Sequence, residues 1–82
     1  MEIFIYTSKR SVKGKMINQL FDYVELPVKP EILYVEEIGE RELIRKGIHS
    51  LPSILIRNGE NKVILSGNIT PKQLQDAMEA VK

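Results

Sequence analysis

The stretch Gly47–Gly59, with the sequence GIHSLPSILIRNG, decides the fold that we expect for this chain. A short polar loop leads into Leu51 and Pro52, and the apolar run that follows, Ser53–Ile56, is typical of a buried strand, which we expect over Ser53–Arg57. Proline has no N–H to donate to a neighbouring strand, so a central strand tolerates it only at its first position. Pro52 stands at that position. The stretch therefore predicts a buried strand entered through a proline loop.

Downstream of this strand the sequence predicts a hairpin and a final helix. The Asn58–Asn61 segment, NGEN, is a hairpin turn signal and leads directly into a second strand, Lys62–Ser66. After a Gly67–Asn68 turn, Thr70 can cap a helix whose first residue is a proline and whose third, Gln73, can complete a capping box. The buried stripe of this helix is expected to be Leu74, Ala77, Met78 and Val81.

Upstream, the chain alternates strands and helices. Glu2–Thr7 is apolar on both alternating faces, which indicates a central strand covered above and below. An apolar stripe predicts a first helix over Lys13–Val24, and two prolines then force an extended link. Glu31–Glu36 is expected to be a second strand, parallel to the first because a helix separates them. Gly39–Gly47 predicts a short amphipathic helix that stops at its final glycine.

Length, composition and charge limit the classes of protein to which this chain could belong. The 82 residues suffice for a single domain, 1–82, and 43% hydrophobic with 28% charged residues is ordinary for a soluble globular protein. No apolar run could span a bilayer and no signal sequence is evident, so we expect a cytoplasmic monomer without membrane association. The net charge of +1 gives no global attraction to nucleic acid. There is no cysteine, which excludes disulfides, thiolate metal sites and cysteine nucleophiles.

The element order strand, helix, strand, helix, strand, strand, helix resembles the thioredoxin fold. The closest resemblance is to small glutaredoxin-like and thioredoxin-like proteins of archaea and bacteria, and it covers essentially the whole chain. It is carried by three segments, IFIYTS, KGIHSLPSILIRNG and LSGNITPKQL. The resemblance implies an α/β protein with a four-stranded mixed sheet flanked by three helices. It also implies a cis peptide bond between Leu51 and Pro52, which would present the Leu51 backbone to an extended peptide or to glutathione.

At one place the sequence departs from the family. Aligning IYTS with the family's strand end puts Ser11 and Gly14 at the two cysteines of the Cys-x-x-Cys motif. Disulfide exchange needs a thiolate that both attacks and leaves, which neither a serine hydroxyl nor a glycine can replace. The resemblance therefore implies a degenerate member of the family that is not a thiol-disulfide oxidoreductase.

Two alternative functions for the loop after the first strand remain open, binding of glutathione and binding of an anion or nucleic acid. Ser11 could activate glutathione as in transferases of the same fold, but a helix cap or loop serine is favoured. No cofactor is expected apart from this possible glutathione. Lys9 falls near the lysine with which glutaredoxins hold a glutathione carboxylate. Basic residues at a helix N-terminus could instead bind an anion or nucleic acid, although a solvated basic loop is favoured. These basic residues are Lys9, Arg10, Lys13 and Lys15.

The other candidate groups favour structural roles. His49 lies near the proline loop, but a single histidine without partner ligands does not make a metal site, so no metal is expected. We expect a non-catalytic protein that binds an extended peptide or another protein at the proline edge. The residues expected to form that binding site are Ser8, Lys9, Ser11, Leu51, Pro52, Ser53, Gly67 and Thr70.

Overall fold

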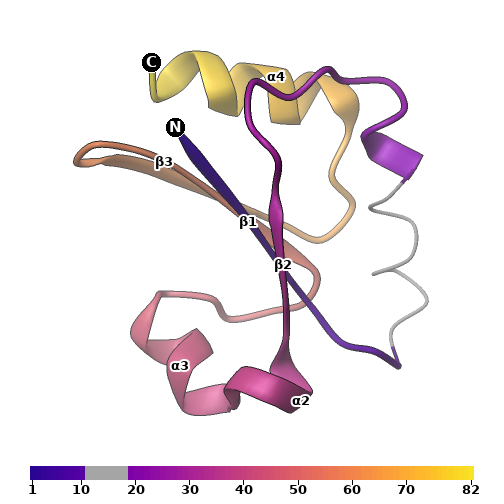
Figure 1. Cartoon of the computed structure of the whole chain (residues 1–82), viewed down its shortest axis with the longest axis vertical. Coiled ribbons are helices and arrows are strands. Elements are labelled where there is room, and N and C mark those ends of the chain that lie inside the picture. The colour runs from indigo at the N-terminus through magenta and orange to yellow at the C-terminus, as the bar shows by residue number, and fades with distance from the viewer. Residues whose placement is uncertain (11–18) are drawn as a thin grey trace.

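Four strands form one mixed sheet in a computed structural model that describes residues 1–10 and 19–82. The strands are β1 (Glu2–Thr7), β2 (Glu31–Tyr34), β3 (Ser53–Asn58) and β4 (Asn61–Ser66). The helices with assigned bounds are α2 (Val35–Ile38), α3 (Glu40–Arg45) and α4 (Pro71–Ala80). The spatial order of the strands is β2-β1-β3-β4, so β1 and β3 are the two central strands. The predicted α/β architecture is confirmed (Figure 1).

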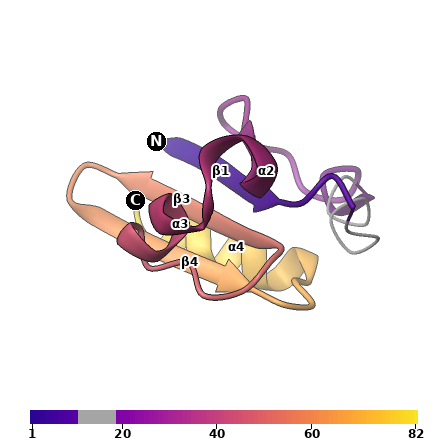
Figure 2. The ribbon, with the colours of Figure 1, turned by 90° about the horizontal axis from the view of Figure 1, so that it is seen from below.

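The two faces of the sheet carry separate apolar clusters, because side chains alternate along a strand. Ile3 and Ile5 of β1 pack on one face with α4, whereas Tyr6 packs on the other face with Leu43 of α3. Figures 1 and 2 show α4 on one side of the sheet and the pair α2 and α3 on the opposite side. The expectation that β1 is covered above and below is therefore confirmed.

The parallel pair and the hairpin follow the prediction, and the structure adds the pairing of β1 with β3. β1 is parallel to β2 and antiparallel to β3, and β3 is antiparallel to β4. The hairpin pairs Asn58 with Asn61, so each strand is one residue longer than predicted and the loop is Gly59 and Glu60 alone. Gly59 has a φ of 64°, the positive value that a two-residue loop of type II′ requires at its first position.

The predicted strand Glu31–Glu36 is too long by two residues. β2 ends at Tyr34, and Val35 and Glu36 instead begin α2. An apolar run of this length does not distinguish a strand from a helix by itself. The pair Glu36 and Glu37 favours the helix, because carboxylates in the first turn interact with its positive end.

The predicted helix Gly39–Gly47 is also corrected. Gly39, with a φ of 84° and a ψ of 154°, separates α2 from α3, and α3 occupies only Glu40–Arg45. Its end matches the prediction that Gly47 stops the helix. The Gly47 N–H donates to Ile44 O over 3.1 Å, and the Ile48 N–H donates to Leu43 O over 2.9 Å. This pair of bonds is a Schellman motif, for which the φ of 80° at Gly47 is suited.

The first half of the predicted first helix, Lys13–Val24, lies outside the described residues. Within them, Gln19 and Leu20 are helical, and the next residues form turns closed by bonds from Asp22 N to Gln19 O and from Tyr23 N to Leu20 O. The helix therefore ends before the predicted Val24. Leu20 and Val24 are nevertheless buried on the α4 face of the sheet, as the apolar stripe requires.

The last helix begins where the sequence predicts. The Thr70 hydroxyl accepts a hydrogen bond from Gln73 N over 3.2 Å, and the Gln73 side chain accepts one from Thr70 N over 2.9 Å. This capping box satisfies donors that the first turn of α4 would otherwise leave unpaired. Leu74, Ala77 and Met78 then face the core.

Replacing Thr70 by alanine removes the acceptor of this capping box. We expect Thr70→Ala to lower the free energy of unfolding by about 0.5–2 kcal/mol, as measured by urea denaturation. Thr70→Ser keeps the hydroxyl and is the matched control, with a smaller loss expected. Equal stability of Thr70→Ala and the unmodified chain would show that the cap does not stabilise α4.

Candidate functional site

Several of the predicted binding residues lie at one end of the sheet. In the strand register Tyr6 is opposite Ser53, and Ser53 is opposite Ser66. Thr7, the last residue of β1, is opposite Tyr34, the last residue of β2. We call this end, where β1, β2 and β4 finish and β3 begins, the site edge. It follows that Ser8, Leu51, Pro52 and Gly67, each next to a strand end or within two residues of one, flank a single edge.

The start of β3 is firmly held. Pro52 and Ser53 are buried, and the Leu51–Pro52 peptide bond is cis. The Ser53 hydroxyl donates to the Ser50 carbonyl over 2.6 Å and lies 2.7 Å from the Ser66 hydroxyl. Ser53 is one of the predicted binding residues, and its hydroxyl is bonded to Ser50 and Ser66 within the protein. These bonds hold the loop before Leu51 in place.

Leu51 differs from its neighbours in the hydrogen bonding of its main chain. The pairing of β3 with its neighbours begins at Ser53, after Leu51. Among the described residues, the main-chain hydrogen bonds of the loops do not involve the Leu51 N–H or C=O. Its side chain is half-buried against the α3 face of the sheet. Within the described part of the chain, Leu51 therefore offers a main-chain donor and acceptor directly beside the site edge.

A groove runs along this side of the molecule, and we call it the Leu51 groove. Its volume is about 610 Å³. Ser8 and Leu51 line it together with residues of α2, α3 and the loop after α3. The full lining is Ser8, Val35, Glu40, Leu43, Ile44, Ile48, His49, Ser50 and Leu51. Two of the predicted site residues, from segments far apart in the sequence, thus share one concave surface.

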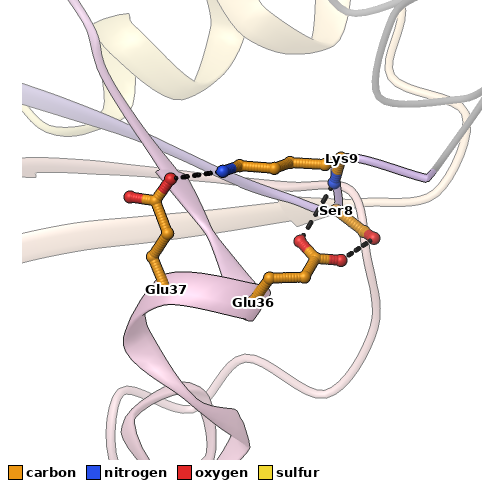
Figure 3. Close-up of polar contacts among 4 residues, drawn as sticks. All are labelled: Ser8, Lys9, Glu36 and Glu37. Carbon is orange, nitrogen blue, oxygen red and sulfur yellow. Dashed lines mark hydrogen bonds and ion pairs between the residues drawn. The ribbon is translucent and has the colours of Figure 1, made fainter.

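The loop after β1 is tied to the start of α2 (Figure 3). The Ser8 hydroxyl donates to Glu36 Oε2 over 2.5 Å, and the Lys9 N–H donates to Glu36 Oε1 over 3.0 Å. The Arg10 N–H in turn donates to the Ser8 hydroxyl over 3.2 Å. One carboxylate thereby holds both the side chain of Ser8 and the main chain of Lys9 at the end of the groove.

The Lys9 ammonium is engaged on the same helix. It lies 2.8 Å from Glu37 Oε1 and 5.4 Å from the centre of the Tyr34 ring. Hydrogen bonding to the Glu37 carboxylate, with the attraction of its charge, raises the pKa of Lys9. The pair is more than half exposed, so it adds little to stability. The pair matters for ligand binding, because Glu37 already balances the charge of Lys9, one of the predicted anion-binding residues.

Hydrogen bonds also perturb Glu36. The bond from the Ser8 hydroxyl, followed by that from the Lys9 main chain, lowers the pKa of the Glu36 carboxyl because both stabilise its ionised form. A carboxyl with a lowered pKa in the folded state stabilises the protein above its unfolded pKa. That stabilisation is lost as the pH falls through the folded pKa.

Not all of the predicted residues can be placed at this edge. Ser11, Gly14, Lys13 and Lys15 lie outside the described residues. Gly67 is exposed, with a φ of 81°, and the Thr70 side chain serves the α4 cap.

His49 was assigned to the surface, and it is exposed on the lining of the Leu51 groove. No cluster of possible metal ligands occurs among residues 1–10 and 19–82.

Sequence reasoning missed the role of Glu36 and the contribution of α3. Glu36 was placed at the end of the predicted strand Glu31–Glu36, and no binding role was assigned to it. A signal was available, because β1 and β2 were expected to be parallel and the residues after parallel strands meet at the same edge. Ser8 and Glu36 follow those two strands. The Leu51 groove could not be inferred, since it depends on the break at Gly39 that places α3.

Comparison with solved structures decides the fold. Thioredoxin 1 from the thermophilic eubacterium Thermosipho africanus superposes with a TM-score of 0.72, at 15% identity, over 96% of this chain and 91% of that chain. The chain has a thioredoxin-like fold. A malarial protein superposes with a TM-score of 0.70, at 12% identity, over 94% of this chain and 91% of that chain. No family model and no curated protein matches the sequence.

The thioredoxin-like fold carries no sulfur chemistry here, because the sequence has no cysteine. What the described part of the site offers is a main-chain edge, a groove and polar groups at its ends. None of the helices in the described ranges is long and apolar enough to cross a membrane.

The tie between the β1 loop and α2 is testable through the titration of Glu36. In an NMR titration of the side-chain carboxyl signals, Glu36 should titrate at lower pH than an ordinary glutamate. Ser8→Ala should move its pKa upward, because the largest cause of the shift is removed. Ser66→Ala, which removes a hydroxyl at the same edge but not one bonded to Glu36, is the control. An unchanged Glu36 pKa in Ser8→Ala would show that the tie is absent in solution.

Proposed function

We propose that this chain is a degenerate glutaredoxin-like or thioredoxin-like protein that works by binding and not by thiol chemistry. Its ligand is an extended peptide segment of a protein partner, held along Leu51. The observation that carries the proposal is the juxtaposition of the Leu51 main chain with the Leu51 groove, in a chain without cysteine.

An extended segment suits both parts of this surface. It adds a short strand by exchanging main-chain hydrogen bonds with Leu51, which supplies affinity without regard to sequence. Its alternate side chains then point into the groove, which supplies selectivity. Backbone recognition needs no reactive side chain, so it is compatible with the loss of both cysteines.

The ion pair of Lys9 favours a peptide over glutathione. The resemblance assigns Lys9 to a glutathione carboxylate, but the Lys9 ammonium is paired with Glu37 and lies over Tyr34. A glutathione carboxylate would have to displace Glu37, and the gain from exchanging one exposed carboxylate for another is small. A peptide that uses the Leu51 edge leaves this pair intact.

The proposal is tested by selecting peptides that bind this chain from a displayed random library. The selected peptides are then mapped on the chain by ¹⁵N chemical shifts. We expect the largest amide shifts at Ser8, at residues 48–53 and in α3. Reduced glutathione at millimolar concentration is the comparison ligand, and we expect it to leave those signals unmoved. Shifts confined to β4 or α4 with every selected peptide would overturn the proposal.

A further inference from the structure

The Leu51 groove has apolar walls. Of its nine lining residues five are aliphatic, and they come from α2, α3 and the loop that follows α3. Ile44 is the most exposed of them, at 65% of its surface, although it is among the most hydrophobic residue types. These five residues are Val35, Leu43, Ile44, Ile48 and Leu51. A large apolar side chain of a bound segment would cover this surface and remove it from water.

The groove has a single carboxylate, that of Glu40. No residue of the described ranges forms an ion pair with it. The neighbouring glutamates are occupied: Glu36 accepts from Ser8 and Lys9, Glu37 pairs with Lys9, and Glu42 pairs with Arg45 over 3.6 Å. Glu40 is exposed and lies one turn before Ile44 on α3. The groove therefore combines an apolar wall with a negative charge that lacks a counter-ion in the described structure.

The spacing between Glu40 and Ile44 is close to the spacing between alternate side chains of an extended ligand. Residues four apart on a helix lie about 5–6 Å from each other. Alternate side chains of a strand point to the same side, about 6.6 Å apart. A strand lying along α3 can therefore place one side chain against Ile44 and the side chain two positions away beside Glu40.

We propose that the Leu51 groove selects extended segments in which a large apolar residue is followed or preceded, two positions away, by lysine or arginine. This inference rests on the proposed function and specifies its ligand. The apolar residue packs on Ile44 and its aliphatic neighbours, and the basic residue pairs with the Glu40 carboxylate. An acidic residue at that position is disfavoured by repulsion from Glu40.

Fluorescence anisotropy with short labelled peptides tests this selectivity. The probes carry leucine and, two positions away on either side, lysine, glutamine or glutamate in an otherwise constant threonine and serine background. We expect the lysine peptide to bind about two- to fivefold more tightly than the glutamine peptide, the range of an exposed ion pair, and less so in high salt. The glutamate peptide should bind most weakly.

Variants assign the preference to the groove. Glu40→Gln should bring the lysine and glutamine peptides to equal affinity, and Glu40→Lys should reverse the order so that the glutamate peptide binds best. Glu42→Gln is the matched control, because Glu42 lies on the same helix but does not line the groove, and the preference should persist. Ile44→Asp should abolish binding of all three peptides. Ile32→Asp, at the other isoleucine that is exposed among the described residues, should not.

The outcomes separate this inference from the proposed function. Peptides that shift Leu51 in NMR spectra but show no preference for lysine, or a preference that survives Glu40→Gln, overturn the selectivity and leave binding at the Leu51 edge intact. Absence of binding near Leu51 by all probes and all library-selected peptides overturns both. Thermal unfolding of each variant verifies that the exposed substitutions leave the fold in place.

Discussion

The antiparallel pairing of β1 with β3 is the constraint on which the rest of the structure depends. Ile3 is opposite Ile56 and Ile5 is opposite Ile54, and all four side chains are buried on the α4 face. Tyr6 and Leu55 are buried on the other face. Because side chains alternate, a slip of one residue would move each apolar set to the wrong face of the sheet. Burial on both faces therefore determines a single register.

That register also builds the site edge. With Tyr6 opposite Ser53, the loop after β1 begins beside the proline loop, and the parallel strand β2 brings Glu36 to the same end. The tie from Ser8 to Glu36 and the break at Gly39 then shape the Leu51 groove. Main-chain donors and acceptors belong to the fold and not to particular side chains, so the proposed recognition at Leu51 does not require a cysteine.

The features that the sequence predicted are those with strong local causes. Pro52 could only begin a central strand, Gly47 suited a helix end that needs a positive φ, and Thr70 with Gln73 formed a recognisable capping box. The errors arose where local preference was weak. The apolar run Glu31–Glu36 was compatible with either a strand or a helix. The groove and the Glu36 tie depend on tertiary placement, which periodicity along the chain does not specify.

The most direct test of the account is amide hydrogen exchange at Leu51, measured by NMR with and without a saturating library-selected peptide. The account predicts rapid exchange in the free protein, because the Leu51 N–H has no partner in the described structure, and strong protection in the complex, because that N–H then donates to the peptide main chain. Protection that appears only in β2 or β4, with Leu51 unchanged, would contradict strand addition at this edge and with it the central claim.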